Sequence, residues 1–275
     1  MHFSSVLTAV CWLLLQISAM NLVAAETRPV YARPAATASS FYIDGYFDYF
    51  DGLPLQEAVD LEGWTAGLDM TLPLRPNMQL RLLLPLRTEA DGILVRNGDK
   101  IEIDGWGGTF DFPTLFFEHQ VVGQEAGSNR VSYFVGYGQR LGVLNTGTPD
   151  KYNHQGRSLH TGLRYDHDLA SGGLLILDSE IRFYETSDDL NPGSLISDSF
   201  VLGTLTAAWL GSRMGAITPG FEVVTRITEN YLAASVIPEL IVHAGQSLDV
   251  KLALLIGISE DAPDWGAQLR MTLSF

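Results

Sequence analysis

Two stretches of alternating apolar and polar residues near the C-terminus constrain the fold of this chain most strongly. In residues 250–259 (VKLALLIGIS) apolar side chains occupy every second position, and residues 265–275 (WGAQLRMTLSF) repeat the pattern. Side chains of a β-strand point alternately to its two faces, so each stretch predicts a strand between an apolar and a polar environment. The short acidic turn at residues 260–264 joins the two strands.

The second of these stretches ends on an aromatic residue, Phe275. An alternating terminal strand that ends in Phe resembles the closing strand of Gram-negative outer-membrane β-barrels. The resemblance implies that this strand is the signal to the barrel-assembly machinery. It also implies that the protein resides in the outer membrane of a Gram-negative bacterium.

Similar alternation elsewhere in the chain predicts about twelve strands, each near the ~9–11 residues that a tilted membrane strand needs. The connections at residues 75–77 and 124–129 are short, whereas those at 88–105, 142–156 and 185–198 are long. Membrane barrels have short periplasmic turns and longer external loops. The predicted fold is therefore all-β: a closed antiparallel transmembrane β-barrel, which pairs every backbone N–H and C=O without an open edge.

Alternation alone does not show which face contacts lipid. The apolar faces continue through about twelve strands, which is too much surface to bury inside one soluble barrel. Aromatic residues also lie near predicted strand ends, as interfacial girdles require. The predicted girdle comprises Phe41, Tyr49, Trp64, Phe183, Trp209, Trp265 and Phe275. We therefore expect the apolar face to contact outer-membrane lipid, with a periplasmic β-sandwich or lipocalin-like barrel as the alternative.

Charged residues of the polar faces would then line the lumen. Folding the hairpin about Ser171 places Arg164 opposite Asp178 and His160 opposite Arg182, and opposed charges on neighbouring strands stabilise each other modestly. Such charges also set a field that selects among polar solutes in a water-filled pore. The candidates for selectivity are Arg81, Arg87, Arg164, Asp178, Glu180, Arg182, Glu222, Arg226, Glu239, Lys251 and Arg270. Barrel size leaves an open channel and a plugged lumen equally compatible with the sequence.

The N-terminus predicts a secretory signal peptide over residues 1–25. Its apolar stretch ends in the small residues Val23-Ala24-Ala25, although no Lys or Arg precedes it. The sole cysteine, Cys11, falls within this stretch, so the mature chain is expected to have neither a disulfide nor a thiol nucleophile. Residues 26–38 are predicted to be a periplasmic lead-in and residues 39–275 to form the barrel.

The charge balance excludes one class of partner. The formal net charge is −15, from 32 acidic and 17 basic residues. A nucleic-acid partner requires a basic surface, so none is expected. The acidic residues gather in predicted loops, where solvated loop tips explain them better than a divalent-cation site does.

No catalytic, metal or cofactor site is predicted. Residues 152–158 (YNHQGRS) resemble the Asn-His region of outer-membrane phospholipase A, whose chemistry needs a Ser two residues after the His on the same strand face. Here Ser158 lies four residues after His154, so a loop histidine is the better interpretation. His160 and His167 fall on opposite strand faces and cannot share a metal ion. The chain also contains no phosphate-binding glycine motif.

The last third of the chain resembles the outer-membrane transporter family assigned to the MetA pathway of phenol degradation. The likeness rests on Pro238-Glu239-Leu240, Gly257, the segment 260–266 (EDAPDWG) and Phe275. It implies passage of a small aromatic or apolar compound across the outer membrane, with no binding residues that carry over. The predicted function is therefore a channel for passive uptake of a small solute, not an enzyme. A barrel-borne lipid hydrolase and a non-conducting structural or adhesion barrel are the alternatives.

Overall fold

The computed structural model describes residues 28–55, 58–96, 99–108, 113–123, 129–139, 156–186, 199–228 and 231–275. The predicted signal peptide and His154 lie outside these ranges. Thirteen strands are present in the described part of the chain: β1 (Tyr42–Leu55), β2 (Ala58–Arg75), β3 (Met78–Arg96), β4 (Asp99–Gly108), β5 (Thr114–Val122), β6 (Arg130–Gln139), β7 (Gly156–Asp168), β8 (Leu174–Thr186), β9 (Ser199–Leu210), β10 (Ile217–Thr228), β11 (Tyr231–His243), β12 (Leu248–Gly257) and β13 (Trp265–Ser274).

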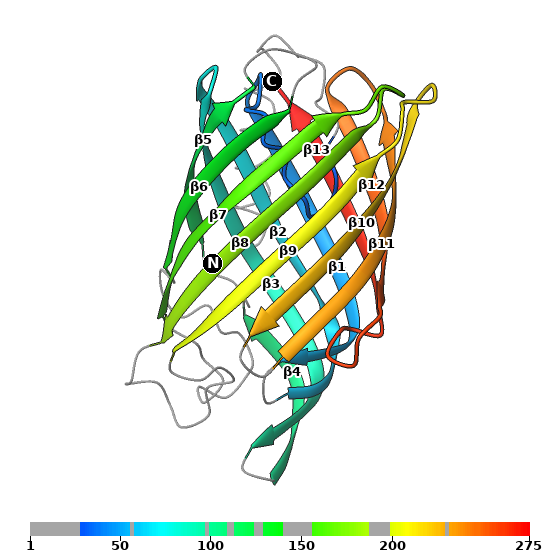
Figure 1. The fold of residues 1–275 in the computed structure, drawn as a ribbon. Coiled ribbons are helices and arrows are strands. Elements are labelled where there is room, and N and C mark those ends of the chain that lie inside the picture. The colour runs from blue at the N-terminus through cyan, green and yellow to red at the C-terminus, as the bar shows by residue number, and fades with distance from the viewer. Residues whose placement is uncertain are drawn as a thin grey trace, which may run out of the picture.

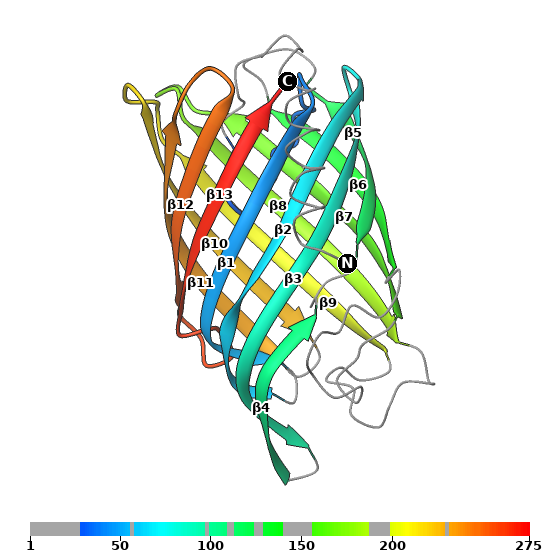
Figure 2. The same ribbon diagram turned by 180° about the vertical axis from the view of Figure 1, so that it is seen from behind.

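The strands close into an antiparallel barrel (Figures 1 and 2). Each strand of the ring pairs with its neighbour in the chain, and β1 pairs with β13 from Tyr42↔Ser274 to Asp51↔Trp265. Strand β4 pairs only with the distal part of β3, while β5 pairs with the first six residues of β3. Leaving β4 aside, the ring has twelve strands, which confirms the predicted closed barrel.

A hairpin of β3 and β4 replaces the long loop that the sequence predicted over residues 88–105. Its register runs from Thr88↔Gly108 to Arg96↔Asp99, and it projects beyond one end of the ring (Figure 2). Residues 93–95 (ILV) and 101–103 (IEI) are rich in β-branched side chains, which favour extended backbone. We call this end of the barrel the hairpin end. The opposite end, at which Phe41 and Phe275 stack with ring centroids 5.6 Å apart, is the terminal end.

The two faces of the wall differ as predicted. Along β12 and β13, Leu252 and Met271 are 48% and 52% exposed, whereas Lys251 and Arg270 are 0% and 7% exposed. The same division holds around the ring, where most exposed large side chains of the wall are apolar and charged side chains are buried inside. An apolar exterior around a charged interior is the arrangement of a barrel that meets lipid on its outside.

Arg87 is an exception, and the prediction that it lines the lumen is wrong. A β-bulge shifts the β2–β3 register between Ala66 and Gly67, so that Leu86 has no partner and Arg87 pairs with Ala66. An extra residue in one strand reverses the facing of every side chain beyond it. Arg87 therefore shares the outer face with Phe47 and forms an ion pair with Glu89, both of them well exposed.

Six of the seven predicted girdle aromatics are at least partly exposed. Tyr49, Trp64, Phe183 and Trp265 lie toward the hairpin end of their strands, and Phe41 and Trp209 toward the terminal end. Tyr49 packs against Trp265 with ring centroids 5.0 Å apart. Phe275 differs from the prediction, because stacking on Phe41 buries it.

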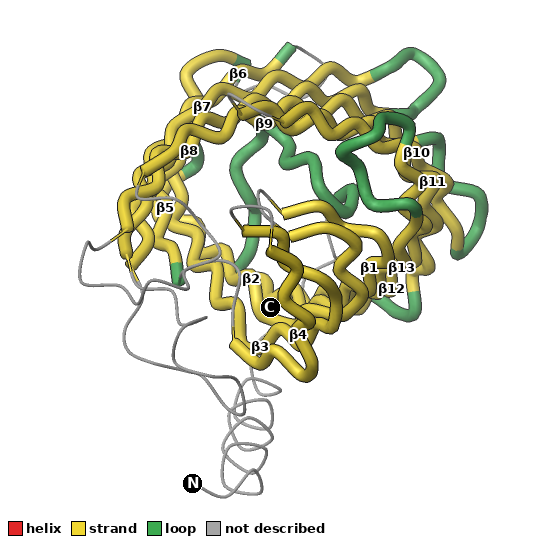
Figure 3. The backbone as a smooth tube through the Cα atoms, turned by 90° about the horizontal axis from the view of Figure 1, so that it is seen from below, coloured by secondary structure: helices red, strands yellow, loops and turns green. Residues whose placement is uncertain are grey.

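Residues 28–40 form no strand and lie inside the ring. The sequence had predicted residues 26–38 to be a periplasmic lead-in outside the barrel. Viewed along the barrel, a stretch of loop backbone crosses the interior (Figure 3). Val30 and Ala32 have no exposed surface. The prediction failed because these residues lack the alternation of a strand; their position is decided by side chains on distant strands.

Candidate functional site

The lumen is occupied by residues 28–40, which we call the plug segment. Seven of its backbone N–H groups, those of residues 30–33 and 36–38, donate hydrogen bonds to side chains of the wall. The acceptors lie on six strands and are Gln79, Gln120, Asp166, Asp178, Glu222 and Glu239. A buried backbone without secondary structure needs such partners, and the polar inner face supplies them.

A pair of buried glutamates holds the start of the plug segment. Glu222 accepts hydrogen bonds from the N–H groups of Val30 (2.8 Å), Tyr31 (2.8 Å) and Ala32 (2.6 Å). Glu239 on the neighbouring strand accepts a second hydrogen bond from Val30, at 3.0 Å. Successive backbone N–H groups that converge on a carboxylate form an anion-binding concavity, and such charge-assisted bonds are stronger than neutral ones.

Arg33 anchors the middle of the plug segment. Asp44 and Asp69 stand directly opposite each other on β1 and β2, and both are completely buried. Two like charges in this arrangement repel. The guanidinium of Arg33 lies between them, with Nη1 3.2 Å from Asp44 and Nη2 bonded to Asp69. Arg81 also binds Asp69 (2.8 Å) and Lys251 lies 3.6 Å from Asp44, so Arg33 of the plug segment adds a third cation to a charge cluster of the wall.

The two ends of the plug segment meet. Arg28 Nη1 donates a hydrogen bond to the hydroxyl of Tyr42 at 2.8 Å, and its guanidinium carbon lies 4.1 Å from the centre of that ring. The segment is therefore a loop that leaves β1, crosses the lumen to β3, β8 and β10, and returns. Strands β3, β8 and β10 all start at the terminal end, and the acceptors Gln79, Asp178 and Glu222 lie within their first six residues. The plug segment therefore obstructs the half of the barrel next to the terminal end.

The wall opposite β12 and β13 holds a second charge cluster. The structure pairs Arg164 with Asp178 and His160 with Arg182 in the predicted register. Arg164 also binds Glu118 at 2.8 Å, and its guanidinium carbon stacks 4.2 Å from the centre of the Phe134 ring. That ring lies against Gly162, where a Cβ atom would come within 2.5 Å of it. Glycine at this position therefore gives the aromatic ring room inside the barrel.

The remaining predicted lumen residues are also on the inner face. Glu180 binds Arg182 at 3.0 Å, Lys251 approaches Asp44 at 3.6 Å and Arg270 approaches Asp48 at 3.9 Å. The guanidinium carbon of Arg226 lies 5.8 Å from the centre of the Tyr31 ring. Most of these charges are paired with each other or face the plug segment.

Two hydrogen-bond chains in the lumen have the order of groups found in hydrolase triads. His160 joins the Ser158 hydroxyl (2.8 Å) to Glu180 (2.7 Å), and His243 joins the Thr218 hydroxyl (2.9 Å) to Asp249 (2.7 Å). Ser158 is only 2% exposed. Because the same chain occurs twice, once at each end of the barrel, we interpret both as buried polar groups that satisfy one another.

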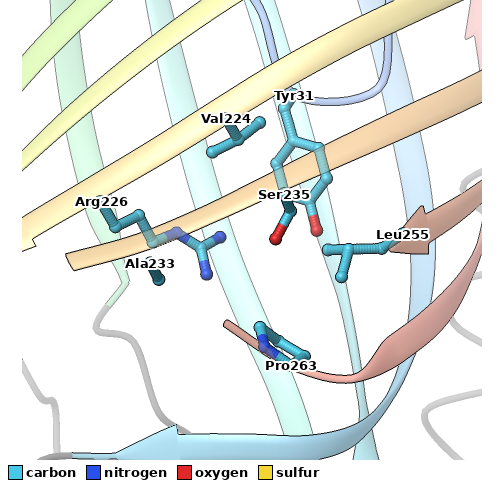
Figure 4. Close-up of a pocket in the computed structure, with 7 residues that line it drawn as sticks. All are labelled: Tyr31, Val224, Arg226, Ala233, Ser235, Leu255 and Pro263. Carbon is cyan, nitrogen blue, oxygen red and sulfur yellow. The ribbon is translucent and has the colours of Figure 1, made fainter. Parts of the chain in front are cut away.

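A small pocket opens beside the plug segment on its hairpin-end side (Figure 4). Tyr31 contributes its ring to the lining, and Pro263 lines it from the connection between β12 and β13. The rest of the lining comes from β10, β11 and β12 and consists of Val224, Arg226, Ala233, Ser235 and Leu255. The pocket combines an apolar wall with one cationic group.

No family model and no curated protein matches this chain. Among solved structures, the COG4313 outer membrane channel from Pseudomonas putida F1 is similar over 91% of this chain and 100% of its own, with 11% identity and a TM-score of 0.56. The translocator domain of the autotransporter NalP from Neisseria meningitidis is similar over 87% of this chain and 89% of its own, with 9% identity and a TM-score of 0.51. At these identities the likeness shows a shared fold, which is that of outer-membrane β-barrels.

Sequence reasoning missed the plug segment and most of its partners. Two signals were present. Residues 28–40 contain two arginines and no strand alternation. Asp44 and Asp69 fall on the polar faces of their own alternating stretches, and the residue directly across from each on the neighbouring strand is the other aspartate. Together these indicate a cationic segment that the lumen has to accommodate.

Proposed function

We propose that this protein is a channel in the outer membrane of a Gram-negative bacterium. It takes up a small aromatic or apolar solute passively, and the plug segment closes it at rest. The terminal end faces the periplasm and the hairpin end faces the outside, as short turns and longer connections suggest. Strand β13 is the signal to the barrel-assembly machinery, and the outer face contacts lipid.

The manner in which the lumen is filled carries this proposal. A barrel that serves only as a structural element can be filled by side chains of its own wall. Here the obstruction is a tethered loop held by hydrogen bonds and ion pairs, each of which water can replace. Such a loop can leave without unfolding the wall, because the strand pairing does not involve it.

The charged inner wall sets the selectivity of the open channel in this proposal. Arg164, Arg182, Arg226 and Arg270 contribute positive charge, and Asp178 and Glu222 contribute negative charge. In a narrow lumen these groups replace part of the hydration of a passing solute.

Replacing both Glu222 and Glu239 with glutamine should open the channel. The variant keeps the shape of the side chains but removes the carboxylates that accept five hydrogen bonds from residues 30–32. Each charged bond is worth about 1 kcal/mol more than a neutral one, so the open fraction should rise at least about tenfold. Single-channel recording in planar bilayers measures this fraction.

Glu185→Gln is the matched control, because this glutamate lies on the outer rim and is well exposed. Its open fraction should equal that of the wild type. A doubly substituted protein that inserts into the bilayer and never conducts would contradict the channel and favour a structural barrel.

Reversing the charge of Arg182 in the open variant should shift ion selectivity toward cations. Arg182 is 23% exposed in the lumen and lies beside Glu180. Arg182→Glu adds negative charge to a wall that solutes must pass. The reversal potential in a salt gradient measures the shift, and Arg157→Glu on the outer rim should leave it unchanged. An unaltered reversal potential for Arg182→Glu would argue against this wall assignment.

A further inference from the structure

The nitrogen of Val30 marks a position between two carboxylates. It lies 2.8 Å from Oε1 of Glu222 and 3.0 Å from Oε2 of Glu239. Both distances suit a hydrogen bond, yet the backbone nitrogen carries one hydrogen for two acceptors. A primary ammonium group carries three hydrogens and a full positive charge, so it fits this position better than the group that fills it.

The wall itself does not neutralise these carboxylates with an adjacent ion pair. Within the described lumen, the two cations of β12 and β13, Lys251 and Arg270, pair with Asp44 and Asp48 instead. Glu222 is completely buried, and Oε1 of Glu239 is buried without a hydrogen-bond partner. Buried charge requires a partner. When residues 30–32 leave, the two glutamates either take up protons or bind a cation or a set of N–H donors.

The surroundings favour an organic cation over a metal ion. Val224, Ile237, Ala253 and Leu255 form a buried apolar cluster around Val30, and Tyr31 packs against it. Divalent cations such as Ca²⁺ require six to eight oxygen ligands, which these side chains do not provide. An aliphatic or aromatic group fits such a surface, and the pocket beside Tyr31 shares Val224 and Leu255 with it (Figure 4).

We propose that Glu222 and Glu239 bind the ammonium group of a primary amine whose body is aromatic or aliphatic. Residues 30–32 occupy this site at rest as a tethered competitor: the N–H of Val30 takes the place of the ammonium group, and the Val30 and Tyr31 side chains take the place of the body. This inference rests on the proposed channel, since it names the class of solute that displaces the plug segment.

Binding of phenethylamine to the purified full-length protein tests the site. Titration calorimetry in detergent would compare the wild type with Arg33→Ala, which loosens the competitor. The loosened variant should bind the amine about tenfold more tightly, because less of the site is occupied. Phenethyl alcohol, which has a similar shape but no charge, should bind at least about tenfold more weakly than the amine.

The deciding comparison uses a third variant, because Arg33→Ala also frees Asp44 and Asp69. Adding Glu222→Gln and Glu239→Gln to Arg33→Ala should weaken amine binding at least about tenfold. Adding Glu185→Gln, a change on the outer rim, should leave amine binding as tight as in Arg33→Ala alone. Circular dichroism verifies the fold of each protein, and Arg33→Ala with Glu239→Gln alone replaces any triple variant that does not fold.

Two results would overturn the inference. One is amine binding by the triple variant as tight as by Arg33→Ala; the other is equal binding of the alcohol and the amine. The proposed channel function can fail separately from the proposed amine site. A protein that binds amine at the two glutamates but never conducts would refute conduction and support the amine site.

Discussion

Replacing Arg33 with glutamate should expel the plug segment and convert a closed barrel into a conducting one. The guanidinium of Arg33 lies between two completely buried aspartates, and the substitution places a third carboxylate there. Breaking a buried ion pair costs about 3–5 kcal/mol. Each 1.4 kcal/mol is a factor of ten, so the ratio of released to bound segment should rise by about two to four orders of magnitude.

Thiol labelling measures this release independently of conduction. Ala35 is 3% exposed in the lumen, and the sole cysteine of the chain, Cys11, falls in the predicted signal peptide, so Ala35→Cys provides a single reporter. A water-soluble maleimide should label it slowly in the wild-type background and rapidly with Arg33→Glu. Arg213→Glu, in the exposed turn between β9 and β10, is the matched control and should leave labelling slow. A protected thiol in Arg33→Glu would show that Arg33 does not hold the segment.

Replacing Arg164 with alanine should lower the free energy of unfolding by about 3–5 kcal/mol. Arg164 is 3% exposed and binds both Glu118 and Asp178, so its loss leaves two buried carboxylates without their cation. Arg157 and Glu185 provide a matched comparison, since they also pair directly across β7 and β8 but are each 57% exposed. Arg157→Ala should cost no more than about 1 kcal/mol. Equilibrium unfolding in denaturant measures both changes.

A compensated variant separates charge from packing. Combining Arg164→Met with Glu118→Gln and Asp178→Asn removes all three charges at nearly constant volume, and it should recover most of the lost stability. Equal destabilisation by Arg164→Ala and Arg157→Ala would show that burial of the inner pair has no energetic consequence.

The wall of the barrel was predictable because its signal is local. Alternation with a period of two decides which side chains face lipid and which face the lumen, as Leu252 and Lys251 illustrate. The turn at Ser171 is also local, and it sets the register that joins Arg164 to Asp178. Within a regular hairpin, one turn determines every pair.

Prediction failed where a single residue or a distant partner decides the outcome. The bulge at Leu86 turned Arg87 to the outer face, although nothing in the neighbouring residues distinguishes it from a regular position. The sequence of residues 88–105 predicted a loop because most of them extend past the ring, where lipid no longer enforces alternation. A hydrogen-bond chain joins Ser158, His160 and Glu180, and it depends on a diagonal contact between β7 and β8. The spacing of residues along the sequence does not reveal such a contact.

The sequence by itself determined a closed barrel with an apolar exterior and a charged interior, because strand periodicity and membrane thickness act on each segment separately. Only the tertiary structure decided what fills that interior. The plug segment has no periodicity of its own, and its place is set by Asp44, Asp69, Glu222 and Glu239, which come from four strands. Those carboxylates converge only after the ring has closed, so their need for a cation and for N–H donors is a property of the folded lumen.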